Sequence, residues 1–314
     1  MIRYVIRRLL AAVPVLLLVG LIAFLLMRLI PGDPAIVMLG HEADPQTLAS
    51  LRRDLGLDHS LPAQFAAWLG RAAQGDLGRS VRDHRPVLGA VLERLPATVE
   101  LTALALVIGV IVALPLGVVT ALRRGSAIDL IGSVAALTGV SVPNFWLAVL
   151  LIFLFAVVLR WLPPSGYAAL TRAPAANLQL MIMPAITLGL WLAAAVMRQV
   201  RSSVLEVMDL EFVRTARAKG LRELRIILSH VLRNALIPVV TTLGLQMGRL
   251  MGGAVITETI FTIPGVGRLA VDAIFARDFP MVQGVVLLMA IAVLLSNLLV
   301  DLCYAALDPR ISYG

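Results

Sequence analysis

The sequence contains six long apolar stretches, each with no charged residue or with a single arginine. An α-helix rises 1.5 Å per residue, so about 20 apolar residues span the roughly 30 Å of bilayer hydrocarbon. Only 15% of the residues are charged and 60% are hydrophobic, whereas soluble domains carry about 25% charged residues. We therefore predict an all-α integral membrane protein with six transmembrane helices, at about residues 9–30, 101–122, 131–159, 178–197, 237–257 and 279–300.

The third stretch contains a proline and the first follows a cluster of arginines, so both need a closer reading. Residues 131–159 are too many for a straight crossing and include Pro143, which lacks the N–H that a helix interior needs. We expect residues 131–142 to lead into a bend at Pro143 and then a span that ends near Leu159. The first stretch follows three arginines, as in a signal peptide, but its apolar part, Leu9–Met27, is longer than a signal core, so we expect a retained helix.

The basic residues of the short loops indicate the orientation, because short cytoplasmic loops are enriched in Lys and Arg. With the N-terminus inside, the inner side receives the arginines before residue 9 and the many basic residues of 198–233. The two short outer loops together carry few arginines. Six spans return the chain to its starting side, so both termini are predicted to be cytoplasmic.

Two parts are predicted along the chain. Residues 1–97 combine the first transmembrane helix with an extracytoplasmic segment of short helices, opening at Asp44-Pro45 and Leu61-Pro62 and running from Pro86 to Pro96, because proline favours the first helical position. This segment is either a cap packed on the helix bundle or a docking surface for an extracellular partner, and both readings can hold. Residues 98–307 form the transmembrane core.

The inner loop 201–236 is too long to be a simple connection. A short helix is expected to end at Gly220, because glycine readily adopts the left-handed conformation that terminates helices. Small residues at Ala216 and Gly220 would let another surface approach closely. A second helix is predicted to follow, with an apolar stripe of Leu224, Ile227, Leu228, Val231 and Leu232. Such a basic amphipathic segment is either a membrane-surface helix or a docking site for a cytosolic partner.

Two segments in this loop, Thr215–Gly220 and His230–Pro238, resemble the EAA loop of ATP-binding-cassette (ABC) importer permeases. Their form is similar to that of the dipeptide, oligopeptide and glutathione branch. The general pattern has Glu-Ala-Ala where this chain has Arg214-Thr215-Ala216, so an acidic contact is absent. Further resemblances run from end to end of the chain, at Tyr4–Leu9, Pro31–Pro34, Leu55–Asp58, Gly75–Ser80, Glu258–Phe261, Pro264–Leu269, Arg277–Pro280 and Asp308-Pro309.

This resemblance implies a permease subunit for small peptides with the type I ABC importer fold, in the bacterial or archaeal cell (inner) membrane. The implied partners are a second homologous permease, one or two cytosolic ABC ATPases, an extracytoplasmic substrate-binding protein and membrane lipid, with no nucleic acid. In such systems the EAA loop forms a cytoplasmic coupling helix that docks on the ATPase. The residues implied here are Glu211, Phe212, Arg214, Thr215, Ala216, Arg217, Ala218, Lys219 and Gly220.

The chain's lysine content indicates where ATP is hydrolysed. Lys219 is the only lysine and lies in Ala218-Lys219-Gly220, whereas a phosphate-binding loop needs Gly-Lys-Ser/Thr. We therefore expect no ATP site, no enzyme activity and no cofactor on this chain, with ATP and Mg²⁺ on the partner ATPases. No catalytic constellation and no metal-ligand spacing is found among its single cysteine and four histidines.

Arg249 lies about 12 residues into the fifth span, near the middle of the bilayer. A central arginine costs at least about 2.5 kcal/mol on insertion scales, so it should face protein or water rather than lipid. We consider it a cation of the translocation path, together with Gln246, Gly248 and Gly252, or a residue paired within the bundle or at a permease–permease contact. The glycines of this stretch also suit close helix packing. Glu258 is expected at the outer mouth.

Other transporter classes fit less well. A proton- or sodium-driven transporter needs intramembrane acids or broken helices in matched halves, and no Asp or Glu lies between the ends of the predicted spans. An intramembrane enzyme would need a catalytic set at membrane depth. Within the importer class, nickel or another small solute is an alternative cargo to a peptide.

Overall fold

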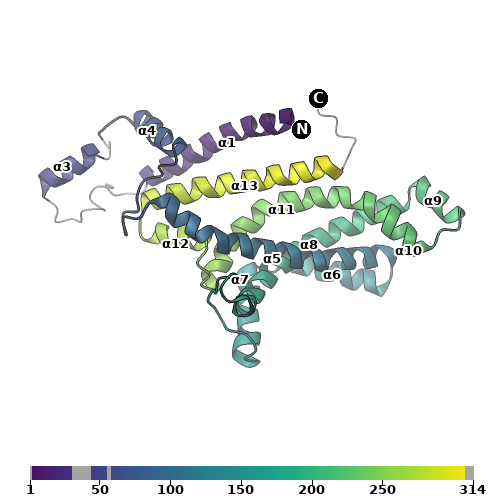
Figure 1. The fold of residues 1–314 in the computed structure, drawn as a ribbon. Coiled ribbons are helices and arrows are strands. Elements are labelled where there is room, and N and C mark those ends of the chain that lie inside the picture. Colours follow the sequence, from purple (N-terminus) through teal and green to yellow (C-terminus); the bar gives the residue numbers. More distant parts are fainter. Residues whose placement is uncertain (1, 30–43, 55–57, 308–314) are drawn as a thin grey trace. The chain divides into compact units, whose positions relative to one another are not determined.

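The computed structural model describes residues 2–29, 44–54 and 58–307, and every regular element of more than one residue in these ranges is a helix (Figure 1). The predicted turn at 31–34 and the motif at 308–309 lie outside the described residues, as do residues 55–57 of another motif. The helices are α1 Ile2–Leu29, α3 Pro45–Asp54, α4 Leu61–Ala73, α5 Val87–Leu122, α6 Ala127–Ser141, α7 Asn144–Leu151, η1 Ile152–Val158, α8 Pro174–Met208, α9 Glu211–Ala218, α10 Glu223–Ile226, η2 Ile227–Val231, α11 Leu232–Ile260, α12 Val266–Phe275 and α13 Phe279–Leu307.

Six membrane crossings agree with the prediction when a bent helix pair is counted as one. Five apolar helices are long enough to cross, and α6 with α7–η1 forms the sixth span with a bend of 101°. The break falls at Pro143, as expected, because proline cannot continue the hydrogen-bond ladder of α6. The all-α membrane fold is therefore confirmed.

Two helices are longer than predicted. The helix expected to run from Pro86 to Pro96 instead continues through Pro96 as α5 to Leu122, because a helix loses only one N–H at a proline and the following apolar run stays helical. Likewise, the predicted amphipathic helix after Gly220 and the fifth span are one continuous helix, 223–260, with the π-helical stretch η2 inside it.

Contacts divide the chain into two units, of which the first comprises residues 1–96 and 264–294. Its core is formed by α4, the start of α5, α12 and the first half of α13. The Phe24 ring packs edge-on against Phe65 at a centroid distance of 5.5 Å, which joins α1 to α4. The outer segment thus packs on transmembrane helices, as one of the two alternatives for it predicts.

Asp278 anchors the loop after α4 to the start of α13. This residue is 3% exposed, and its carboxylate accepts hydrogen bonds from the Ser80 hydroxyl at 2.5 Å and the Val81 N–H at 3.1 Å. It also accepts from the N–H of Met281 at 3.3 Å, which caps the N-terminus of α13. Two motifs that are far apart in the sequence, 75–80 and 277–280, therefore meet around one buried carboxylate.

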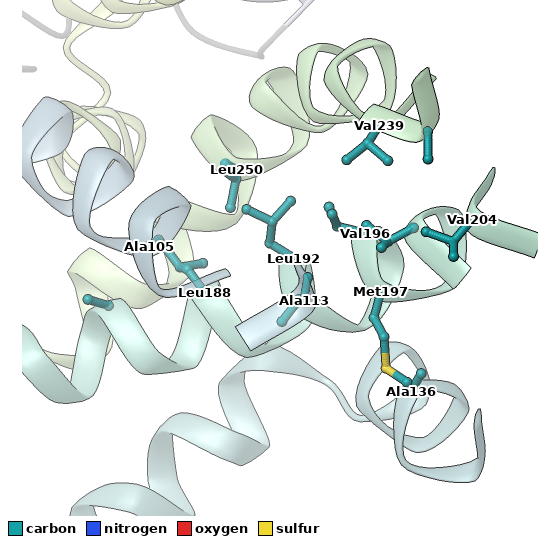
Figure 2. Packing of buried hydrophobic residues seen from close by; sticks show 14 of the residues in the cluster. Ala105, Ala113, Ala136, Leu188, Leu192, Val196, Met197, Val204, Val239 and Leu250 are labelled. Carbon is teal, nitrogen blue, oxygen red and sulfur yellow. The ribbon is translucent and has the colours of Figure 1, made fainter. Parts of the chain in front are cut away.

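The second unit comprises residues 97–263 and 295–314 and is organised around α8. Leu188, Leu192 and Val196 of α8 point toward residues of α5 and α11 in the buried cluster (Figure 2). Met197 extends toward Ala136 of α6 (Figure 2). The predicted division at residue 97 separates two consecutive parts of the chain, whereas each contact-based unit combines two separate ranges. The two divisions are not comparable, so the predicted one stays a prediction.

Small residues on α5 allow a close approach to α8. An added Cβ at Gly109 would lie 2.7 Å from Leu192, and one at Gly117 would lie 2.7 Å from Val200. Both distances are shorter than real Cβ contacts, so α5 and α8 can touch only because these positions are glycine. The glycines belong to a stripe with a small residue at every fourth position: Ala105, Gly109, Ala113, Gly117 and Ala121.

Candidate coupling surface and membrane-facing residues

Helix α9 begins and ends as its sequence predicts. Glu211 lies in its first turn and Arg217 in its last, the charge order that the helix dipole favours. Gly220 has φ +74°, and its N–H donates to the Arg217 carbonyl at 2.9 Å while the Leu221 N–H donates to Ala216 at 3.3 Å. These two bonds form a Schellman motif, which requires the left-handed residue that glycine supplies.

One face of α9 packs on its own unit and the other is exposed. Val213 is fully buried and Ala216 is 8% exposed, both in the core that contains Val204 of α8 and Ile226 of α10. Ala216 is therefore not part of an open small-residue surface with Gly220, and its methyl group packs inward. The other predicted coupling residues are exposed: Glu211, Phe212, Arg214, Thr215, Arg217, Ala218, Lys219 and Gly220.

Ion pairs hold the exposed charges of α9 in place. Arg214 contacts Glu211 at 2.9 Å within the helix. Arg217 makes two contacts with Glu223 of α10, at 3.2 and 2.7 Å, and the hydrogen bond to Glu223 raises the pKa of Arg217 above its ordinary value. Pairs as exposed as these contribute little to stability. Their effect is to orient the guanidinium groups on the outer face of α9.

In the helix after Gly220, two leucines of the predicted apolar stripe are exposed, although we expected that stripe to be buried. Leu224 is 67% exposed and Leu228 is 57% exposed, whereas Ile226 and Val231 are fully buried. The π-helical stretch η2 follows Leu224 and adds a residue per turn, which rotates the side chains after it away from their α-helical positions. Figure 1 shows α9 and α10 together at one end of α8 and α11.

Two of the predicted path residues on α11, Arg249 and Gly252, are exposed, whereas Gln246 is buried and Gly248 is half-buried. Arg249 is exposed, and its Nη1 donates to Oε1 of Gln246 at 3.3 Å. Gln246 is 6% exposed. Gly252 is exposed, and an added Cβ there would meet no heavy atom of the described chain within 4 Å. Leu245, one turn before Arg249, is 74% exposed.

Gly253 differs from Gly252, its neighbour in the predicted glycine stripe. An added Cβ at Gly253 would lie 3.3 Å from Leu188 of α8. Close packing therefore applies to Gly253, whereas Gly252 faces away from the rest of the described chain.

Two acids lie beside predicted spans, the buried Glu258 of α11 and the half-buried Glu100 of α5, which the sequence pattern did not point to. Glu258, expected at the outer mouth, is 0% exposed and accepts a hydrogen bond from Thr98 at 2.6 Å. Glu100 accepts from Asn177 at 2.5 Å and from the Tyr167 hydroxyl at 3.0 Å. Burial, with Glu100 beside it, raises the pKa of Tyr167 to about 12. Both acids flank predicted spans, and only the longer helices of the structure include them.

A metal centre is not evident in the described ranges. Among residues 2–29, 44–54 and 58–307, no group of three or more His, Cys, Asp or Glu residues is placed to hold a metal ion.

Two family descriptions together cover most of the chain. Residues 113–313 match the family of binding-protein-dependent transport system inner membrane components. Residues 1–102 match the N-terminal part of membrane components of the same transport systems. The second match covers α1, the outer segment and the first part of α5, and the first covers the end of α5 and the spans that follow.

Relatives and a solved structure agree with these matches. A peptide transport system permease protein of Brucella suis is 44% identical over 98% of both chains. A glutathione transport system permease protein of Pectobacterium atrosepticum is 44% identical over the full length of both. An inward-facing structure of the MetNI methionine ABC transporter covers 70% of this chain and 96% of its own, with a TM-score of 0.57 at 20% identity, which shows a shared fold.

Proposed function

Because the chain belongs to the family of binding-protein-dependent transport system inner membrane components, we propose that it forms, with partner subunits, the path by which small peptides enter the cell. It is a multi-pass permease of the inner membrane with the type I ABC importer fold. The peptide cargo is supported by relatives named for peptide and glutathione transport at 44% identity over essentially the whole chain.

The proposed partners are a second homologous permease, one or two cytosolic ABC ATPases that bind ATP and Mg²⁺, and an extracytoplasmic substrate-binding protein. The observation that carries this proposal is the structure of α9, which lies on the arginine-rich, cytoplasmic side. Its inner residues Val213 and Ala216 are buried in the unit core, while its outer residues from Glu211 to Gly220 are exposed. A short helix fixed on one face and free on the other can transmit force from a docked ATPase to the membrane helices.

Two exposed leucines, Leu224 and Leu228, follow α9 along the chain. Leu228 lies about 13 Å before the predicted start of the fifth span at residue 237, given a rise of 1.5 Å per residue. Hydrocarbon therefore does not reach Leu224 or Leu228, which are more than half exposed. Together with Phe212, which is 41% exposed, Leu224 and Leu228 offer the proposed ATPase apolar side chains on an arginine-rich segment.

Replacing Phe212 with aspartate should remove the ATPase from the purified complex. Because the ring is exposed, its loss leaves the core of this chain intact, while the new charge must be desolvated at any docked surface. We expect affinity for the ATPase to fall about 100-fold, which corresponds to about 3 kcal/mol. The measurement is the amount of ATPase that co-purifies with the permease in mild detergent, together with peptide uptake in membrane vesicles.

Leu170→Asp serves as the matched control, because Leu170 is 52% exposed and lies in the loop predicted to be on the opposite side of the membrane. This control should retain the ATPase. Equal retention of ATPase by Phe212→Asp and wild type would contradict docking on α9. A wild-type chain that purifies without any ATPase would contradict the importer assembly as a whole.

The proposed translocation path includes Arg249, Gln246, Gly248 and Gly252 of α11. Arg249 could meet the carboxylate of a passing peptide, since its guanidinium is exposed and loosely held by Gln246. Arg249→Leu should leave the complex assembled and lower peptide uptake about tenfold, the effect of one charge-assisted contact. Arg249→Lys, which keeps the charge, should lose less.

Whether the permease complex still assembles distinguishes a role of Arg249 in the path from a role in a permease–permease contact. Subunit composition is measured on the same samples as uptake. Loss of the second permease from the Arg249→Leu complex would show that this arginine serves a permease–permease contact instead.

A further inference from the structure

Asp129, near the start of α6, connects three parts of the second unit. Its Oδ1 and Oδ2 accept hydrogen bonds from Nε and Nη2 of Arg201 on α8, at 2.6 and 2.8 Å. The N–H of Gly125, in the turn from α5, donates to Oδ2 at 3.0 Å. Asp129 is 7% exposed and the Arg201 side chain is 28% exposed. Such two-point arginine–carboxylate contacts fix both distance and direction.

Arg201 is close to the proposed coupling helix along α8. This helix ends at Met208, and α9 begins at Glu211 after only two residues. The last turns of α8 share one buried cluster with α9, since Val204, Val207 and Val213 all belong to it. A displacement of α9 is therefore expected to move the end of α8, and Arg201 with it, because packed interiors transmit movement as rigid blocks.

Other contacts between α6 and α8 are apolar. An added Cβ at Gly132 would lie 3.0 Å from the terminal methyl of Met197, and one at Gly139 would lie 3.0 Å from the Ala194 Cβ. Small apolar residues hold helices close together but do little to resist sliding along the axis, and sliding of packed helices is a common conformational change. The Arg201–Asp129 contact adds a directional constraint on the axial position of α6 against α8 at this end.

The far end of α6 is the break in the third span. Beyond Ser141 the chain turns by 101° into α7 at Pro143, and the inside of the bend holds a groove of about 530 Å³ lined by Thr138, Ser141 and Trp146, among others. An axial shift of α6 would change this angle first, because the break has no continuous hydrogen-bond ladder to resist it.

We propose that Arg201 and Asp129 are positioning residues that pass movement of α9 to the broken span α6–α7. The pair keeps α6 in register with α8, so a shift that an ATPase imposes on α9 changes the bend at Pro143 instead of letting α8 slide along α6. This role rests on the proposed coupling of α9 to an ATPase.

The test uses the whole purified complex with its ATPase and two fluorescent reporters. In a Cys303→Ser background, an environment-sensitive fluorophore is attached at Ser202→Cys on α8 or at Ser141→Cys in the groove, both exposed positions. The signal change on adding Mg-ATP with vanadate is measured at each position. In the otherwise wild-type complex, both reporters should respond.

Breaking the pair should separate the two responses. In Arg201→Ala and in the isosteric Asp129→Asn, the Ser202→Cys response should persist while the Ser141→Cys response falls about tenfold, as expected when a hydrogen-bonded charge contact is lost. The double variant should be no worse than either single variant. The Ser141→Cys response of Arg201→Lys should lie between those of Arg201→Ala and wild type. The response of Arg198→Ala should equal that of wild type, because Arg198 is an exposed arginine on the same helix.

Several results would overturn the proposal. An undiminished Ser141→Cys response in both variants would show that α6 follows α8 without the pair. Equal loss at both reporters would mean that the pair only maintains the fold. If only the Ser141→Cys reporter is silent in the wild-type complex, this inference alone fails. If the Ser202→Cys reporter is silent as well, coupling through α9 fails together with it.

Discussion

Replacing Gly189 with valine is expected to remove most of the folded permease from the membrane. A Cβ at this position of α8 would lie 2.9 Å from the Ala105 carbonyl oxygen of α5 and 2.9 Å from Cγ2 of Ile108. The first neighbour is backbone and cannot turn aside, so the helices must separate. Overpacking costs about 1–3 kcal/mol where side chains can adjust, and we expect at least the upper figure here. The measurement is the yield and melting temperature of the detergent-purified protein.

A glycine on an open face provides the control. Gly252→Val adds the same side chain to α11, where no heavy atom of the described chain lies within 4 Å of an added Cβ. This variant should fold with wild-type yield, and any loss of uptake would then support a place for Gly252 in the path. If Gly189→Val melts at the same temperature as Gly252→Val, the close α5–α8 contact is wrong.

Replacing Glu258 with alanine is expected to have the next largest effect on stability. Glu258 is completely buried and accepts the Thr98 hydroxyl at 2.6 Å. The substitution takes away this acceptor and leaves a cavity between α5 and α11. Large-to-small changes at buried positions cost about 2–5 kcal/mol, and a buried donor left without its acceptor costs about 1–3 kcal/mol. We expect a loss of about 3 kcal/mol, measured as a lower melting temperature by size-exclusion chromatography after heating.

Glu258→Gln separates shape from charge. Glutamine has the same size and keeps a carbonyl oxygen for Thr98, so it should lose less than half as much stability as alanine. A variant Glu258→Ala as stable as wild type would show that the acid does not join these helices. Equal and large losses in both variants would instead show that the negative charge itself is needed at this site.

Spans and helix ends were predictable because they depend on neighbouring residues. Apolar length identified the crossings, and Pro143 identified the break in the third one. Gly220 marked the end of the segment that is α9, where its φ is +74°. Boundaries were less accurate where a helix continued through Pro96 or through the π-helical stretch η2, because a proline or a π-helical turn can lie inside a continuous helix.

The inner and outer faces of the helices were harder to predict. Sequence analysis identified the glycines around Gly252 as a packing stripe, while Gly109 and Gly117 of α5 make the close contacts with α8. The α5 stripe has the same spacing of small residues and was visible in the sequence. It was not singled out because small residues are frequent in membrane helices whether or not they lie at a contact.

Composition and local pattern by themselves determined that this chain crosses the membrane and where the short helix α9 ends, and they predict which side its basic loops occupy. Only the tertiary structure decided that Ala216 packs inward and that Asp129 meets Arg201, 72 positions away. The reason is physical. In water, an apolar side chain marks the face that must be buried, but lipid is as apolar as a protein core. Within the bilayer, the buried faces are therefore set by shape and polar contacts.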